Sequence, residues 1–277
     1  MCKVKFSSQC LKSGGVSLKK KHQGKCCICG KEGNLTYEHV PPKSAFNSSR
    51  IKPYYVWEWL LEDKKRTANL QAGQGDYTLC ESCNNLTGTW YGSAYADFAA
   101  QGMEYYNKGA SGKLSLPYAI FPLRVFKQIV SCFASVNGPD WCEKNPAVRR
   151  FLLTPYEQSF PEDIDIRMYM HEKGKVKICA PSGQLNIFTH EMVVGSEWGF
   201  VPFSFICILG KDKTRHKLLD KMPSIKSFLE FRYDDKVTVF LDTPRFPCNP
   251  LPFDFRPNIP DIKDTELVRE EPENDPT

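Results

Sequence analysis

Long apolar segments are missing from this chain of 277 residues. The longest apolar run, at 198–209, is interrupted by Gly199, Pro202 and Ser204 and is too short to span a bilayer. Residues 1–20 are polar and basic and contain no apolar core, so we expect no secretory signal peptide. These two absences predict a cytoplasmic protein that does not contact a membrane.

Repeats and several common catalytic motifs are also missing. We find no internal repeat along the chain. Residues 113–260 contain no glycine-rich phosphate loop and no carboxylate pair that stands out, and their histidines, His171, His190 and His216, are scattered. We therefore assign no chemistry to this part of the chain and look for function in the residues that precede it.

The chain carries a formal net charge of +5, but this charge is unevenly distributed. Residues 1–66 contain 14 Lys and Arg against 5 Asp and Glu, whereas residues 261–277 contain 2 against 7. A basic amino-terminal part predicts a polyanionic partner, because Lys and Arg displace counterions from phosphates. The alternative is that Lys19, Lys20 and Lys21 belong to a solvated tail.

Cysteine, in contrast, is abundant, with 12 residues. Thiols stay reduced in the cytoplasm, so we do not expect a disulfide framework. Four cysteines form two Cys-x-x-Cys pairs, Cys26 with Cys29 and Cys80 with Cys83, and this spacing indicates a metal site. The other cysteines are scattered, and we expect most of them to be small buried apolar side chains.

The paired cysteines have the number and type of ligands that a closed tetrahedral zinc site requires. Four thiolates leave no open coordination position, so the predicted zinc is structural and stabilises a domain with a small core. The alternatives are unrelated free thiols or a redox-active Cys-x-x-Cys. A redox pair needs a thioredoxin-like βαβ context, which the sequence does not indicate.

Hydrophobic periodicity predicts an α+β chain in four parts. These parts are a flexible basic lead at 1–23, a first domain at 24–112, an α+β accessory domain with mostly antiparallel strands at 113–260, and an acidic disordered tail at 261–277. Helices are predicted at 53–66, 84–107, 123–137 and, capped by Asn145, 146–153. Strands are predicted at 35–40, 164–170, 176–180, 185–189, 203–209 and 237–241. Residues 244–260 are expected to wrap the surface.

A histidine with an adjacent carboxylate lies between the two cysteine pairs. Glu38 and His39 end the predicted strand at 35–40, just before Pro41 and Pro42, neither of which can donate a hydrogen bond to a sheet. Asn84 directly follows the last paired cysteine and opens a predicted helix. In this order, over about residues 24–108, the motifs together resemble the HNH endonucleases, which have the ββα-metal fold.

The resemblance implies an amino-terminal ββα-metal domain that hydrolyses phosphodiester bonds in DNA and leaves 5′-phosphate and 3′-hydroxyl ends. His39 would be the general base that deprotonates water, since imidazole titrates near neutral pH. Glu38 and Asn84 would hold one Mg²⁺ or Mn²⁺ ion, a cation that prefers oxygen ligands and would stabilise the transition state. For a free-standing protein of this kind we expect a role in restriction or phage defence.

Two features of the sequence depart from a simple match. Adjacent residues on a strand point to opposite faces, so Glu38 and His39 can serve one site only if the strand bends or ends there. The family's last signature residue, a His or Asn inside the final helix, is not evident near 87–89. Asn85 or water would have to complete the metal shell, and a degenerate, inactive module is an alternative.

Basic and aromatic residues near these motifs suggest contacts with a nucleic acid, with DNA expected more than RNA. The candidate phosphate contacts are Lys43, Lys64, Lys65 and Arg66, each of which could equally be a solvated surface residue. Trp90, Tyr91 and Tyr95 could stack on bases, but at this helical spacing we favour a place in the core.

Two non-enzymatic functions remain open. One is a zinc-dependent module that binds nucleic acid without cutting it, and the other is a zinc-stabilised protein-interaction module. Glu38, His39 and Asn84 separate the nuclease from both, because a structural zinc site needs none of them. The accessory domain is a candidate surface for a modified base, a flanking duplex, a protein partner or oligomerisation.

Overall fold

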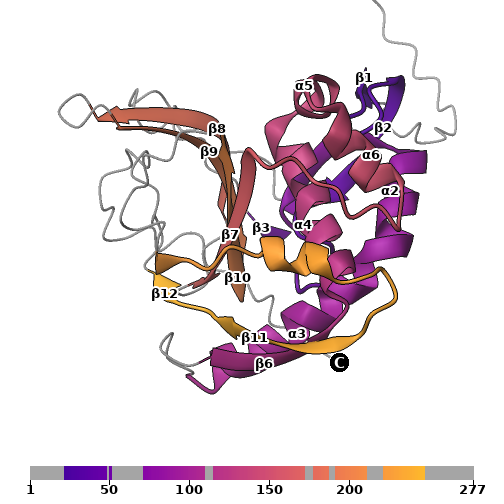
Figure 1. Ribbon diagram of the computed structural model, residues 1–277. Helices are drawn as coiled ribbons and strands as arrows, with labels where there is room; N and C mark the ends of the chain where they lie inside the picture. Colours follow the sequence, from indigo (N-terminus) through magenta and orange to yellow (C-terminus); the bar gives the residue numbers. More distant parts are fainter. Residues whose placement is uncertain are drawn as a thin grey trace, which may run out of the picture.

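The computed structural model describes residues 22–48, 50–51, 71–109, 115–171, 177–186, 191–210 and 221–246 (Figure 1). Several predictions concern residues outside these ranges. They are the basic lead, the helix at 53–66 with the candidate contacts Lys64, Lys65 and Arg66, nearly all of the segment at 244–260, and the acidic tail.

The described strands form four sheets, and the α+β class is confirmed (Figure 1). A three-stranded antiparallel sheet has the order β1-β2-β5, with the bounds β1 His22–Lys25, β2 Glu32–His39 and β5 Gly75–Cys80. A five-stranded sheet has the order β12-β7-β10-β9-β8, and β12 pairs in parallel with β7 while the other pairs are antiparallel. The bounds of its strands are β7 Ile164–His171, β8 Lys177–Asn186, β9 Glu191–Phe200, β10 Phe203–Leu209 and β12 Arg245–Phe246. The two ribbons pair β6 Ser115–Ile120 with β11 Val237–Asp242, and β3 Arg50–Ile51 with β4 Gln71–Ala72.

A long helix follows β5 and confirms the prediction at 84–107, although it begins three residues earlier. It consists of α2 Glu81–Thr87, a π-helical segment Gly88–Gly92 and α3 Ser93–Asn107. The glycines at both ends of the π-helical segment leave room for its wider turn, and such segments often lie at functional sites. The backbone makes its closest approach farther along, at Gly102, where a Cβ atom would lie 2.2 Å from the Phe203 ring.

The middle of the chain folds into three helices, α4 Pro122–Asn137, α5 Pro139–Lys144 and α6 Pro146–Leu153. The predicted helices at 123–137 and 146–153 are confirmed. α4 ends at Gly138, whose φ of 82° suits glycine. Asn145 is the N-cap of α6, as predicted, and its carbonyl accepts from the Val148 amide at 3.0 Å. Its side chain makes no capping hydrogen bond, because the side-chain amide donates to the Trp141 carbonyl at 2.8 Å.

Three of the predicted strands, at 164–170, 203–209 and 237–241, agree with β7, β10 and β11 to within one residue. The strands predicted separately at 176–180 and 185–189 are wrong as separate elements, because one strand, β8, continues to Asn186 with a register shift between Cys179 and Ser182. Strand β9 was not predicted. Gly195 interrupts the alternation of apolar and polar residues that would have indicated a strand. Only glycine fits at this position, since a Cβ would lie 2.7 Å from the Cys207 carbonyl oxygen.

The hydrophobic core is shared by segments from both sides of residue 112. Tyr95 and Phe98 of α3 pack against Trp198, Phe203 and Phe205 of the five-stranded sheet, and the Phe98 and Phe203 rings stack with centroids 4.4 Å apart. Residues of the first cysteine turn belong to the same cluster of buried side chains as α4. The division into two domains stays a prediction, and the core gives the cysteine sites direct contact with the rest of the fold.

Candidate metal centre and catalytic residues

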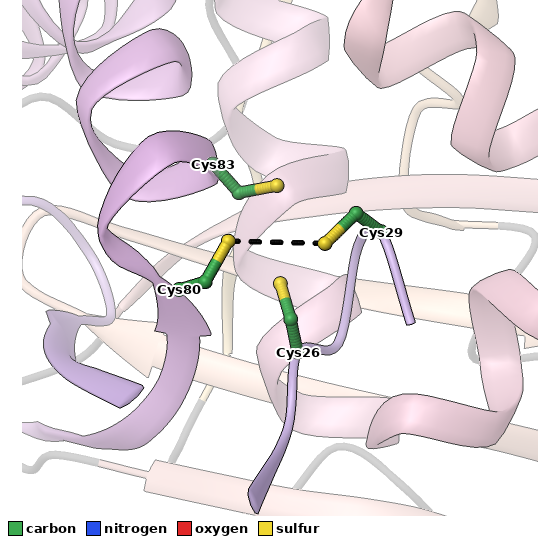
Figure 2. Close-up of side chains that lie close together, drawn as sticks. All are labelled: Cys26, Cys29, Cys80 and Cys83. Atoms are coloured by element: carbon green, nitrogen blue, oxygen red, sulfur yellow. Dashed lines mark hydrogen bonds between the residues drawn. The ribbon is translucent and has the colours of Figure 1, made fainter. Parts of the chain in front are cut away.

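The sulfur atoms of Cys26, Cys29, Cys80 and Cys83 all lie within 4.8 Å of one another and could hold a metal ion (Figure 2). The Sγ atoms of Cys29 and Cys80 are 3.8 Å apart. A zinc ion binds thiolates at about 2.3 Å, so a regular tetrahedron places its sulfurs about 3.8 Å apart. The spacing therefore fits a tetrahedral ion with a small contraction of the longest separation.

Two local structures direct the four thiols to one point. The first pair lies in a tight turn after β1, where the Gly30 amide donates to the Cys26 carbonyl at 2.9 Å and Gly30 has a φ of 76°. The second pair lies where β5 becomes α2, with Cys80 as the last strand residue and Cys83 in the first helical turn. Thiolates at a helix amino terminus are favoured by the positive end of the helix dipole.

Electrostatics within the cluster favour a cation. A hydrogen bond from Cys83 lowers the pKa of Cys26 to about 4, and the same interaction with Cys26 raises the pKa of Cys83. Burial is the main cause that raises the pKa of Cys29. The first thiolate thus forms readily, and its negative charge raises the pKa values of the neighbouring thiols. A divalent cation at the centre would offset this repulsion and allow the other thiols to ionise.

The other described cysteines are not members of this cluster. Cys27, Cys132, Cys142 and Cys207 are buried, which confirms the apolar role expected for them, while Cys179 is partly exposed. Burial raises the pKa of Cys27 to about 12, so this neighbour of the cluster is a poor thiolate ligand. Its backbone amide instead donates to the Thr78 carbonyl at 2.9 Å and ties the first cysteine turn to β5.

Asn84 is held against β2 in one orientation. Its Nδ2 atom donates to Thr36 Oγ1 at 2.9 Å and to the Tyr37 carbonyl at 3.4 Å. Thr36 uses its own hydroxyl proton to donate to the Leu79 carbonyl at 2.9 Å, so its oxygen can only accept from Asn84. This network fixes which end of the amide faces the strand and leaves the Oδ1 atom as an acceptor.

Glu38 is a buried carboxylic acid, with 6% of its surface exposed. Burial raises its pKa to about 8, because the charged form loses its hydration. Burial raises the pKa of Cys132 in α4, and the negative charge of Glu38 raises it further. Glu38 therefore faces the side of β2 on which α4 packs.

His39 is the last residue of β2 and is partly exposed. Its ring packs edge-on against Tyr37, with centroids 5.0 Å apart, and Tyr37 in turn packs edge-on against Tyr77 at 5.4 Å. The stacked rings of Tyr77 and His22 extend this aromatic row, with centroids 3.4 Å apart. His39 thus lies on the face of the sheet that carries the aromatic side chains.

The predicted catalytic residues are divided between the two faces of β2. Strand alternation places Glu38 beside Thr36, which Asn84 contacts, and His39 beside Tyr37 on the opposite face. Side chains two residues apart on one face lie about 7 Å apart, within reach of one hydrated ion. A register shift between Thr36 and Tyr37 twists the strand just before Glu38, and β2 ends at His39. The metal shared by Glu38 and Asn84 stays a prediction.

The remaining candidates are placed as follows. Lys43 is exposed in the segment after β2, which leaves its phosphate contact a prediction. Tyr91 and Tyr95 are fully buried, so the preference for the core is confirmed and stacking on bases is not available to them. Trp90 is partly exposed, and its carbonyl accepts a hydrogen bond from Tyr233 at 3.1 Å.

Sequence reasoning missed two residues that lie near His39 and hold the loops around it. Asn47 is fully buried, and its Nδ2 donates to the carbonyls of Pro41 at 2.7 Å and Gln74 at 2.8 Å, while its Oδ1 accepts from the Gln74 amide at 2.6 Å. Gly73 has a φ of 89°, and a Cβ there would lie 2.9 Å from both Asn47 Oδ1 and His39 Cδ2. The only sequence signals were an Asn and a Gly in loops, which are too common to be selected.

Comparisons with known proteins do not assign a family: no family model, no curated protein and no solved structure matches the chain. Within the described ranges, no helix has the length and apolar character needed to cross a membrane.

Proposed function

We propose that this protein is a metal-dependent HNH-type endonuclease with a structural zinc ion, acting on DNA. The zinc would be held by Cys26, Cys29, Cys80 and Cys83, whose sulfur spacing fits a tetrahedral ion. The chain order of β2, β5 and α2, with the cysteines at the turn before β2 and at the start of α2, supports the proposal of a ββα-metal domain. The zinc has no open position and takes no part in the chemistry.

The orientation of Asn84 is the observation that carries the catalytic part of the proposal. The amide nitrogen of Asn84 donates to β2, so the Oδ1 atom is kept as an acceptor that a cation could use. A buried carboxylate with a raised pKa is a second feature that a divalent cation would explain, because binding the cation would ionise Glu38. The oxygen atoms of Glu38 and Asn84 fit the ligand preference of Mg²⁺ or Mn²⁺.

In the proposed reaction, His39 accepts a proton from the attacking water through its imidazole nitrogen. The water oxygen forms a bond to phosphorus, and the bond from phosphorus to the 3′ oxygen breaks, which leaves a 5′-phosphate and a 3′-hydroxyl. When bound, the cation would neutralise charge that develops on the phosphate and on the departing oxygen. Because His39 and Glu38 use opposite faces, the phosphate would lie across the end of β2, where the strand stops.

The proposal is tested by plasmid nicking with Mg²⁺ or Mn²⁺. We expect His39→Ala to lower the nicking rate by about 10²- to 10⁴-fold, the usual contribution of a general base. Glu38→Gln should also lose activity, whereas Glu104→Gln, the same change at an exposed position of α3, should keep it. Zinc content should be unchanged in all three variants, because none of them alters a cysteine.

The results also separate the alternatives. Equal nicking by the parent protein and His39→Ala would remove His39 from the mechanism. Salt-dependent DNA binding without cleavage under any divalent cation would indicate a zinc-dependent binding module. A lack of DNA binding at low salt would leave the protein-interaction module.

A further inference from the structure

The segment that follows His39, residues 40–48, has a regular division between buried and exposed side chains. Ala45 and Asn47 point inward and are buried. The exposed side chains are Lys43, Ser44, Phe46 and Ser48. The segment therefore exposes one aromatic residue together with a lysine and two serines, a few positions after the proposed general base in the chain.

Phe46 is held in an unfavourable backbone conformation. Its φ is 67°, which makes it the one residue other than glycine with a positive φ in the described part of the chain. A bulky L-residue in this region is strained, because its Cβ approaches the following carbonyl oxygen. The ring is 43% exposed, so burial offsets little of this strain. Strained residues of this kind gather at functional sites.

The residues on both sides of Phe46 are held by hydrogen bonds. Asn47 anchors the segment through its three hydrogen bonds to Pro41 and Gln74, and the Ala45 amide donates to the Pro42 carbonyl at 2.8 Å. Side-chain atoms of Asn47 and His39 each lie 2.9 Å from the point that a Gly73 Cβ would occupy, so they are less than about 6 Å apart. Phe46 therefore lies between two residues held by hydrogen bonds, and its neighbour Asn47 lies near the imidazole.

We propose that Phe46 stacks on a nucleobase next to the scissile phosphate and so positions the nucleic-acid strand beside His39. An exposed aromatic ring offers a face to any base, and Lys43 with the serine hydroxyls can bind the flanking phosphates. The charge of these neighbours favours a polyanionic strand over an apolar protein surface. This inference rests on the proposed nuclease function and adds the residue that holds the substrate.

The test measures binding of a fluorescein-labelled 20-nucleotide DNA, single-stranded and duplex, in a His39→Ala background that prevents cleavage. Phe46→Leu keeps apolar bulk without an aromatic face, so we expect the Kd to rise by about 5- to 150-fold, the range for loss of one stacked base. Phe46→Trp should bind as well as the parent, and DNA should quench its added tryptophan. Phe240→Leu is the matched control, because Phe240 is 67% exposed on β11, in the separate β6–β11 ribbon.

Phe46→Gly separates binding from folding. Glycine relieves the left-handed strain, so this variant should keep or raise the Tm while it loses DNA affinity. A clear fall in Tm would make Phe46 a packing residue and overturn the inference. If Phe46→Leu binds DNA with the parental Kd and nicking still requires His39, the inference about Phe46 is overturned while the nuclease proposal stands. A parent protein that binds neither the single-stranded nor the duplex DNA would overturn both the inference and the nuclease proposal.

Discussion

Lys127 of α4 offers a direct test of how burial sets stability in this fold. Its side chain is fully buried, and its ammonium group donates to the carbonyls of Phe151 and, at 3.0 Å, Thr154, at the end of α6. It also lies 3.6 Å from the centroid of the Phe151 ring. Burial lowers the pKa of Lys127 to about 7 from 10.5, and Glu157 opposes this effect.

The lowered pKa predicts stability that rises with pH. Between pH 7 and 10.5 the unfolded state binds more protons at this residue than the folded state, so unfolding becomes less favourable as pH increases. One pKa unit corresponds to about 1.4 kcal/mol, so the full effect is about 5 kcal/mol. Between pH 7 and pH 9 the unfolded lysine stays protonated while the folded lysine loses the rest of its proton, and the gain in stability over this range is about 2 kcal/mol.

The assay compares the parent protein with Lys127→Met by urea unfolding at pH 7 and pH 9, with a reducing agent present. Methionine fills similar space but leaves the Phe151 and Thr154 carbonyls without this donor, a penalty that does not depend on pH. The free energy of unfolding of the parent, minus that of the variant, should increase by about 2 kcal/mol over this range. An unchanged difference would mean that the carbonyls and the ring keep the lysine charged, and that burial alone does not set its pKa.

Three further changes test the metal centre and the packing. Cys80→Ser should abolish zinc binding and most of the folded state, since structural zinc contributes about 10–16 kcal/mol and domains are stable by about 5–15 kcal/mol. Cys179→Ser is the control, and equal zinc content in the two purified variants would refute the zinc site. Asn47→Ala should lower the free energy of unfolding by about 3 kcal/mol, because it removes the side-chain partner of the buried Pro41 carbonyl and of the Gln74 amide, while the Gln74 carbonyl keeps its bond from the Val40 amide. Circular-dichroism melts that overlap with the parent would contradict this. Gly102→Ala should lower the free energy of unfolding by about 1–3 kcal/mol, although alanine has the better helix propensity, because the alanine Cβ would lie 2.2 Å from the Phe203 ring. A higher Tm for this variant would show that the ring can move aside.

Much of the local structure was readable from short-range patterns. The two Cys-x-x-Cys pairs identified all four members of the sulfur cluster, because ligand spacing within a turn or a helix start is a local property. Strict alternation at 164–170 and the apolar stripe at 123–137 likewise specified β7 and α4. The errors came where a local signal was weak or ambiguous, as with the glycines of β9 and the side chain of Asn145.

The candidate catalytic residues show where sequence reasoning stops. Glu38 and His39 are neighbours in the chain and suggested a single site, yet the regular pleat of β2 turns them to opposite faces. Burial raises the pKa of Glu38, and the carboxyl group acts on Cys132 of α4, a helix almost a hundred residues away in the chain. Asn47 and Gly73 became visible as neighbours of His39 only when two loops were brought together.

The sequence by itself determined the four members of the cysteine cluster, the class of the fold and the positions of most helices and strands, because these follow from the chemistry of residues a few positions apart. The tertiary structure decided the order of the strands, the shared core, the burial of Glu38 and Lys127 and the strained exposure of Phe46. Each of these depends on contacts between segments that are distant in the chain, and a local pattern carries no information about which segment will pack against it.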